Sequence, residues 1–361
     1  MHCKVCILTN IPSPYRVLLF DELAKNDEFE LCLIYYRHNE SNRKWALPKL
    51  MHRAIFLNES TLSKINFHQD ILSVLLREKP DVIIAAGFTI SIIIAFLFAK
   101  AKRKKFIVFT DSWLHSVNNL KKHNRFIRKH IIPKADASIC VGQKGKEFLN
   151  SYGAKTDSIF KSPLAIDNEY YHKYYIPIEK KKFDFIFSGQ FINRKMPFFV
   201  IDILKRFKKR NGQLKFLLIG SGPLENDIIT ELTRAEIEFE YPGFIQQKEL
   251  PKYYASAKLL LFPTLDDPWG LVANEACAVG TPVITCGNAG VASDLILHDF
   301  NGYVLPLVAD VWVSHIENLL NDFNKYNQFS KNAMLLSQNY SIAKSAEGIL
   351  RAINFAMKSH A

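Results

Sequence analysis

Asp267 and Glu275 lie eight residues apart around a Pro-Trp-Gly turn that follows an apolar, strand-like run. The turn leads into a helical pattern, and the first backbone N–H groups of such a helix lack intrahelical partners and attract phosphate. We therefore expect Gly270, Leu271 and Val272 to bind a diphosphate. On the same element, Glu275 would bridge two ribose hydroxyls and Asp267 would bind hydroxyls of a sugar. One segment would then hold both ends of a sugar–diphosphate–nucleoside.

A second segment, residues 188–199 (SGQFINRKMPFF), supplies cations. Arg194 and Lys195 follow Gly189 and the end of another apolar run, where they would stabilise the negative charge that develops on a departing diphosphate. The alternative is a solvated helix start without a ligand. The Gly-Ser-Gly turn in residues 217–228 is weak evidence by itself, because glycines often serve only a tight turn.

Residues 265–284 resemble the signature of family-4 retaining glycosyltransferases of the GT-B fold, which reads E-x-F-G-L-x-x-x-E-A-x-A-x-G-x-P-V. Trp269 takes the aromatic place, and Asp267 stands where the first Glu is expected, one methylene shorter. The identical positions are Gly270, Leu271, Glu275, Ala276, Ala278, Gly280, Pro282 and Val283.

The segment around Lys195 resembles the family's G-R-x-x-x-x-K-G element, which supplies cations to the donor diphosphate. Gly189 and Lys195 match, whereas Gln190 replaces the usual Arg and Met196 replaces the second Gly. Arg194 is a candidate substitute for the missing charge.

The resemblance covers residues 180–305 closely and the rest by domain layout. It implies that the backbone near Phe244 meets the nucleobase, and that a hexosyl group is transferred with retention. It also implies that no cofactor is used and that the cations and the helix start bind the diphosphate without a metal. The adjacent acids Asp266 and Asp267 are therefore not expected to form a metal site.

The N-terminal half departs from the family pattern. Residues 9–20 (TNIPSPYRVLLF) replace its usual glycine pair, and Arg16 stands at a helix start where it would contact the acceptor or a phosphate. Asp111, with His115 nearby, occupies roughly the place where family members often carry a His near the reacting sugar. Alternatively, Arg16 is an ordinary exposed side chain and Asp111 caps the next helix.

Short apolar runs alternate with helical patterns in two sets, which indicates parallel strands covered on both faces. We predict an α/β protein of two doubly wound, Rossmann-like domains facing across a cleft, as in the GT-B fold. Residues 1–165 would form the acceptor-side domain, 166–182 a linker and 183–340 the nucleotide-sugar domain, with a C-terminal helix in 341–361 rejoining the first. The apolar stretch 82–99 is long enough to test as a membrane span, but Gly87 and Thr89 divide it into a strand, a turn and a helix.

The net charge of +12 is concentrated in the first half. Residues 1–170 hold 26 Lys and Arg against 16 Asp and Glu, and the remainder holds 21 against 19. The basic runs 100–105 and 121–130 form either a solvated surface or a contact for an anionic partner such as membrane headgroups. Nucleic acid is disfavoured, because no reading motif or aromatic platform accompanies them.

We expect a cytoplasmic enzyme, because no signal peptide is evident and the six cysteines show no metal-site or disulfide pattern. A peripheral location at the inner face of the membrane is compatible with this expectation. The donor would be a nucleotide sugar and the acceptor a saccharide or lipid-linked saccharide, with surface-polysaccharide synthesis as the setting. The alternatives are a nucleotide-sugar epimerase of the same fold and a basic protein that binds nucleic acid or anionic surfaces without turnover.

Overall fold

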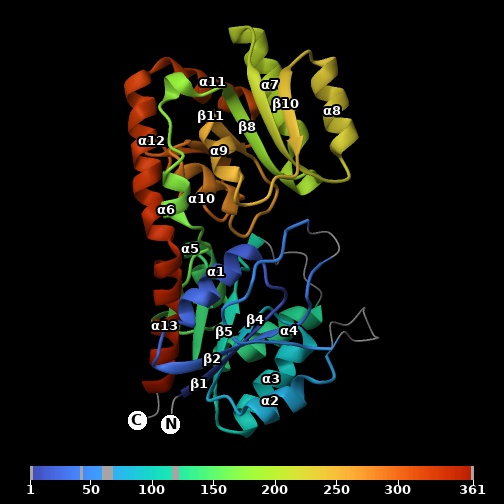
Figure 1. The fold of residues 1–361 in the computed structure, drawn as a ribbon, viewed down its shortest axis with the longest axis vertical. Coiled ribbons are helices and arrows are strands. Elements are labelled where there is room, and N and C mark those ends of the chain that lie inside the picture. Colours follow the sequence, from blue (N-terminus) through green and yellow to red (C-terminus); the bar gives the residue numbers. More distant parts are fainter. Residues whose placement is uncertain (1–2, 41–43, 59–67, 116–121, 359–361) are drawn as a thin grey trace. The chain divides into compact units, whose positions relative to one another are not determined.

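The computed structural model describes residues 3–40, 44–58, 68–115 and 122–358. The chain divides into two compact units (Figure 1). Unit 1 comprises Met1–Leu164 and Ile342–Ala361, and unit 2 comprises Ala165–Ser341.

Unit 1 is built on a parallel sheet in the order β3-β2-β1-β4-β5-β6-β7. Its central strands read as unbroken apolar runs because helices cover both faces. The strands are β1 (Cys3–Thr9), β2 (Phe29–Tyr35), β3 (Ala54–Phe56), β4 (Val82–Ala86), β5 (Lys105–Thr110), β6 (Ala137–Cys140) and β7 (Ile159–Lys161).

The helices of unit 1 include one from the other end of the chain. This helix, α13, places Ile349 and Ile353 in the same buried cluster as Ile7 of β1, and it lies beside α1 (Figure 1). The helices are α1 (Pro14–Leu23), α2 (Ile71–Glu78), α3 (Ile90–Ala101), α4 (Lys122–Ile131), α5 (Gln143–Ser151) and α13 (Ile342–Lys358).

Unit 2 repeats the design with a parallel sheet in the order β10-β9-β8-β11-β12-β13. Phe185, Leu218 and Leu261 from its central strands pack in one buried core. The strands are β8 (Phe183–Gln190), β9 (Lys215–Ser221), β10 (Glu238–Gly243), β11 (Ala257–Phe262), β12 (Val283–Cys286) and β13 (Gly302–Leu305). The helices are α6 (Asn168–His172), α7 (Pro197–Asn211), α8 (Glu225–Arg234), α9 (Leu250–Ala255), α10 (Leu271–Ala278), α11 (Ala309–Asn321) and α12 (Phe323–Ser337).

The structure shows how two segments fold for which the sequence allows other interpretations, the apolar stretch 82–99 and the predicted linker 166–182. Residues 82–99 form β4 and most of α3, as predicted, and no helix of the described residues has the length and apolarity to cross a bilayer. Residues 166–182, predicted to be a linker, are instead folded within unit 2, where they form α6 and bury Tyr171. A run rich in tyrosine and lysine looks like a linker by composition, but Tyr171 packs in the interior of unit 2.

Candidate functional site

The strand order of unit 2 reverses between β8 and β11, and doubly wound sheets bind ligands at the carboxyl ends of the strands that flank such a point. Both segments singled out in the sequence begin here. Residues 188–199 begin at the end of β8, and residues 265–284 follow β11. The fold therefore brings them to one edge of one sheet.

The turn after β8 is held against the turn after β9 by glycines. Gly189 has φ +153°, and a Cβ at Gly220 would lie 1.8 Å from the carbonyl oxygen of Gly189. A Cβ at Gly222 would come within 2.6 Å of the carbonyl oxygen of Phe191. Any side chain at these two positions would push the turns apart, so the glycines hold the loop that carries Lys195 in place.

Lys195 and Asp267 form an ion pair that joins the two loops. Lys195 ends a short 3-10 turn, Asn193–Lys195, and the two side chains keep only 15% and 11% of their surface exposed. The Asp267 carboxylate also accepts a hydrogen bond from the backbone N–H of Trp269 at 3.2 Å. The structure thus places together the cation and the acid that were expected at opposite ends of the donor's sugar phosphate.

Arg194 joins the loop after β8 to the loop after β11. Its guanidinium donates to the carbonyl oxygen of Asp266, and its own carbonyl oxygen accepts from Leu265 N–H at 2.9 Å and from the Thr264 hydroxyl at 3.0 Å. These bonds tie the two loops together. Arg194 is therefore a brace between the loops, and a contact to the diphosphate would require its side chain to leave Asp266.

The start of α10 has the geometry of an anion site. Gly270 precedes the helix with φ +105°, a left-handed conformation that a side chain disfavours, and its Cβ would lie 2.3 Å from the ring of Phe262. The helix begins at Leu271, so Leu271 and Val272 present N–H groups of its first turn. The buried Trp269, whose indole N–H donates to Asn274 at 2.8 Å, fixes the turn from below.

Glu275 lies on the second turn of α10 with only 6% of its surface exposed. Tyr254 donates to Oε2 at 2.6 Å and Tyr171 donates to Oε1 at 3.3 Å. Burial raises the pKa of Glu275 to about 7, against the lowering effect of both hydroxyls. Burial and the neighbouring carboxylate in turn raise the pKa of each tyrosine well above its usual range, so both remain donors. The two tyrosines therefore hold the carboxyl group of Glu275 in a fixed orientation. This group changes its protonation state near neutral pH.

Phe244 lies in the loop between β10 and α9, with its side chain half-buried. The carbonyl of Lys248 in the same loop accepts from Tyr170 at 2.9 Å, and that of Gln247 lies 3.4 Å from the Tyr171 hydroxyl. Tyr171 and Tyr254 are not among the site residues that the sequence predicts. The sequence signal for the first is the tyrosine cluster at 170–175, which lies within the predicted linker.

The candidate residues of unit 1 gather at the equivalent edge of its own sheet. Arg16, in the first turn of α1 after β1, lays its guanidinium over the Phe109 ring at 4.5 Å. Its Nη1 is buried without a hydrogen-bond partner among the described residues.

Asp111 directly follows β5, and its side chain is exposed. The capping alternative concerns a helix start that extends into residues 116–121, which lie outside the described residues. The His115 ring lies 5.3 Å from that of Trp113, centroid to centroid.

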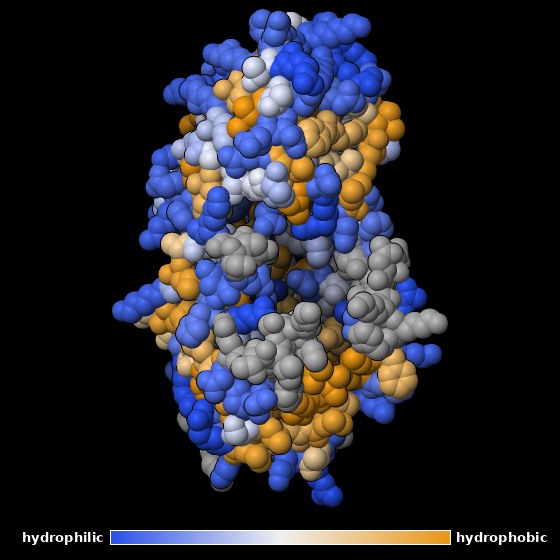
Figure 2. Space-filling view, turned by 90° about the vertical axis from the view of Figure 1, so that its right-hand side faces the viewer, coloured by the Kyte–Doolittle hydropathy of each residue, from blue (hydrophilic) through white to orange (hydrophobic). Residues whose placement is uncertain are grey.

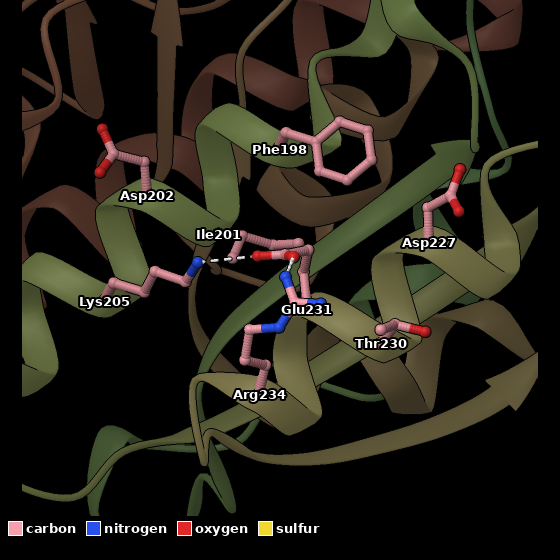
Figure 3. Close-up of a pocket in the computed structure, with 8 residues that line it drawn as sticks. All are labelled: Phe198, Ile201, Asp202, Lys205, Asp227, Thr230, Glu231 and Arg234. Atoms are coloured by element: carbon pink, nitrogen blue, oxygen red, sulfur yellow. Dashed lines mark hydrogen bonds and ion pairs between the residues drawn. The ribbon is translucent and has the colours of Figure 1, made fainter.

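A groove of about 480 Å³ lies elsewhere on unit 2, between α7 and α8 (Figure 3). Glu231 lies between Lys205, at 3.0 Å, and Arg234, so its charge is already balanced. Neither helix face carries a residue of the candidate site. This groove is therefore separate from the candidate site at the strand ends.

Known proteins resemble this chain in sequence and in fold. Residues 173–335 match the protein family described as Glycosyl transferases group 1. The uncharacterized glycosyltransferase MJ1607 of Methanocaldococcus jannaschii is 29% identical over 143 residues, which cover 38% of this chain and 36% of that protein. The amylovoran biosynthesis glycosyltransferase AmsK of Erwinia amylovora is 29% identical over 114 residues, 29% of this chain and 28% of that protein. These matches thus span about a third of each relative's length.

A longer match reaches an uncharacterized 41.2 kDa protein in the cps region of Klebsiella pneumoniae, which is 22% identical over 84% of this chain and 87% of that protein. Among solved structures, Anabaena Alr3699/HepE in complex with UDP superposes with a TM-score of 0.78 at 15% identity, over 98% of this chain and 100% of that one. Sucrose-phosphate synthase of Thermosynechococcus elongatus gives a TM-score of 0.79 at 16% identity, over 99% and 100%. The chain therefore has the GT-B fold, as predicted, and its residues 173–335, which contain the candidate donor site, match glycosyl transferases group 1.

Proposed function

We propose that this chain is a retaining glycosyltransferase that moves a hexosyl group from a nucleotide-diphosphate sugar to a saccharide or lipid-linked saccharide. The observation that carries the proposal is the grouping of the Lys195–Asp267 pair, the start of α10 and the buried Glu275 at the switch point of unit 2. The likeness to a protein that binds UDP supports a nucleotide donor.

Each group would have one task. Lys195 would exchange Asp267 for the diphosphate, whose other oxygens would accept from the N–H groups of Leu271 and Val272. Asp267, released from the ion pair, would bind hydroxyls of the sugar, and Glu275 would bind the ribose. Lys195 and the N–H groups of Leu271 and Val272 would stabilise the charge on the departing nucleoside diphosphate, so we propose that the reaction needs neither metal nor cofactor.

Transfer with retention follows if the acceptor hydroxyl attacks from the face that the diphosphate leaves. The bond from the anomeric carbon to the phosphate oxygen breaks as the bond to the acceptor oxygen forms, and a phosphate oxygen takes the acceptor's proton. The protein's task is then to hold charge and position. In unit 1, Asp111 and His115 would orient the substrates and Arg16 would contact the acceptor.

The first experiment is a thermal-shift and calorimetric panel of UDP-, GDP-, ADP- and TDP-sugars. We expect one base to be preferred, and mass spectrometry with that donor to detect transfer or slow donor hydrolysis. Glu275→Ala should abolish both. A chain that binds no nucleotide sugar, or that works equally well without Glu275, would contradict the proposal. An epimerase would instead convert the donor sugar without an acceptor.

For the setting, we propose cytoplasmic synthesis of a bacterial surface polysaccharide. The names of two relatives, the amylovoran biosynthesis glycosyltransferase AmsK and the protein in the cps region, support this setting. A lipid-linked acceptor would require the enzyme to reach a membrane surface.

Unit 1 offers a surface suited to that contact. On α3, Ile90, Ile93, Ile94 and Leu97 follow one another at helical spacing. Ile90 and Leu97 are 38% and 59% exposed, whereas Ile93 and Ile94 are half-buried against the core. A solvated helix face is normally polar, so such a stripe marks an interaction site. The lower half of Figure 2, which is unit 1 seen from the side of α3 and α4, shows a corresponding hydrophobic area.

Basic side chains adjoin this stripe. Lys102 and Arg103 at the end of α3 are exposed, and α4 presents Phe126, 63% exposed, between the exposed Arg125 and Lys129. Apolar residues flanked by cations suit an interfacial contact with anionic lipid. Part of the basic run is already neutralised, since its three other cations pair with acids. These are Lys100 and Lys105 with Asp136, and Lys104 with Asp81.

Co-sedimentation with vesicles containing phosphatidylglycerol tests this surface. We expect Leu97→Ser to weaken binding several-fold, whereas Leu335→Ser, at a residue of unit 2 that is 57% exposed, should change nothing. Equal binding by both variants would remove the membrane from the proposal and leave glycosyl transfer intact.

A further inference from the structure

The short helix α6 contacts two parts of the proposed nucleoside site, α10 and the loop between β10 and α9, through two adjacent tyrosines. Tyr170 donates to the carbonyl of Lys248 at 2.9 Å. The Tyr171 hydroxyl lies 3.3 Å from Glu275 Oε1 and 3.4 Å from the carbonyl oxygen of Gln247, so its single proton is shared between the carboxylate and the loop that carries Phe244.

The helix itself is firmly anchored. Asp167 caps it by accepting from the Tyr170 N–H at 3.0 Å. The Asn168 amide donates to the carbonyl of Ser337 at 2.7 Å in a buried contact. Tyr171 is 2% exposed, so its hydroxyl has little freedom to move elsewhere. The position of the carboxylate is therefore set by α6 as well as by α10.

The number of lone pairs on the Glu275 carboxylate shows how its fixed position would serve binding. An ionised carboxylate offers about four acceptor positions on its two oxygens. Tyr254 takes one on Oε2 and Tyr171 takes one on Oε1, which leaves one acceptor position on each oxygen. Two adjacent hydroxyls of a ribose would use one position each.

We propose that Tyr171 is a positioning residue for nucleoside recognition, which keeps Glu275 oriented and ionised for the ribose and links it to the loop beside the base. The inference rests on the proposed donor function. The direction of its effect follows from the local electrostatics: burial disfavours the Glu275 carboxylate, and a hydroxyl that donates to it counters this. Loss of the Tyr171 hydroxyl should therefore raise the pKa of Glu275 further.

The test is Tyr171→Phe in the full chain, with calorimetric affinities for whichever nucleoside diphosphate the wild type binds and for inorganic pyrophosphate. We expect the variant to bind the nucleoside diphosphate about tenfold more weakly near neutral pH. The deficit should shrink as the pH rises, because the midpoint of the pH dependence has moved upward. Pyrophosphate, which has no ribose, should bind both proteins equally.

Two further variants keep the outcome interpretable. Tyr326→Phe removes another buried hydroxyl of unit 2, which donates to the Lys258 carbonyl at 2.8 Å, and should leave both affinities unchanged. Tyr170→Phe should weaken nucleoside binding without moving the pH midpoint, because it touches the loop and not the carboxylate.

Several results would overturn the inference while leaving the donor function standing. They are a Tyr171→Phe variant that binds like the wild type at every pH, and one that loses affinity for pyrophosphate and nucleotide alike. A wild-type chain that binds pyrophosphate but no nucleoside diphosphate would instead overturn the proposed function and this inference with it.

Discussion

The two units share one architecture but differ in how their candidate residues are held. In unit 2 the residues that follow β8 and β11 contact one another directly, as Lys195 does Asp267. In unit 1 the corresponding edge carries Arg16 stacked on Phe109 and an exposed Asp111. The proposed donor half is thus preorganised by its own side chains, whereas Asp111 of the other half is exposed to solvent.

This difference suits the chemistry proposed for each unit. A nucleoside diphosphate is a constant group, so a site for it gains affinity from rigidity, which lowers the ordering cost of binding. An acceptor differs from one enzyme to the next, so its residues are not expected to follow a common pattern. The predictions below test whether changes in unit 2 act on donor binding while changes in unit 1 spare it.

The largest effect is expected for Glu275→Gln. The amide cannot accept two ribose hydroxyls on equivalent oxygens, so affinity for the nucleoside diphosphate should fall about a hundredfold by calorimetry, the order expected when hydrogen bonds to a charged group are lost. Pyrophosphate binding should persist, and Tyr326→Phe again serves as the control. A loss of less than about threefold would separate Glu275 from the donor site.

Glu275→Gln should stabilise the folded chain although it weakens nucleotide binding. The folded chain holds the Glu275 proton to about pH 7, against 4.5 for an ordinary glutamate. Because the folded state binds the proton more tightly than the unfolded state, this group lowers the free energy of unfolding as pH rises through that window. Glu275→Gln removes the penalty, so it should raise the melting temperature at about pH 8 more than at about pH 5. An equal shift at both would contradict the raised pKa.

Lys195→Met should have the next largest effect. It removes the cation that would meet the diphosphate, so UDP and pyrophosphate should both bind about thirtyfold more weakly, as expected for a lost charge-assisted contact. Asp267→Asn is the informative partner. It frees Lys195 from its ion pair, so diphosphate affinity should hold or rise while the transfer rate falls about a hundredfold. A parallel loss of affinity in both variants would show that the pair is only structural.

Gly270→Ala tests the turn that starts α10. The added Cβ would meet the Phe262 ring at 2.3 Å in a left-handed backbone, whereas Gly212 has φ +84° and no atom within 4 Å of its Cβ position. We expect Gly212→Ala to cost about 1 kcal/mol of unfolding free energy and Gly270→Ala about 2 kcal/mol more. Equal melting temperatures would show that the ring moves aside.

In unit 2, the sequence predicts the parts of the candidate site that local geometry decides and not the contacts between distant segments. The donor segments are continuous along the chain, so one strand, turn and helix place Gly270 and Glu275 by local geometry alone. Tyr171 reaches Glu275 from 104 positions away, and nothing in the spacing of either residue reveals that contact. Likewise, the pairing of Lys195 with Asp267 depends on β8 and β11 being neighbours in the sheet, which the strand pattern implies only after the strand order is known.

The smallest effect on donor binding is expected in unit 1. Arg16→Met keeps the packing against Phe109 but removes the guanidinium, whose Nη1 has no partner among the described residues. If that group awaits the acceptor, the KM for the acceptor should rise about fivefold to tenfold while the affinity for UDP stays within twofold, because a single hydrogen bond to a charged group is lost. Arg206→Met, at an exposed arginine of unit 2 that pairs with Asp202 and Asp310, is the matched control. A fall in UDP affinity with Arg16→Met would show that the residue serves the donor, and the division of labour between the units would then have to be redrawn.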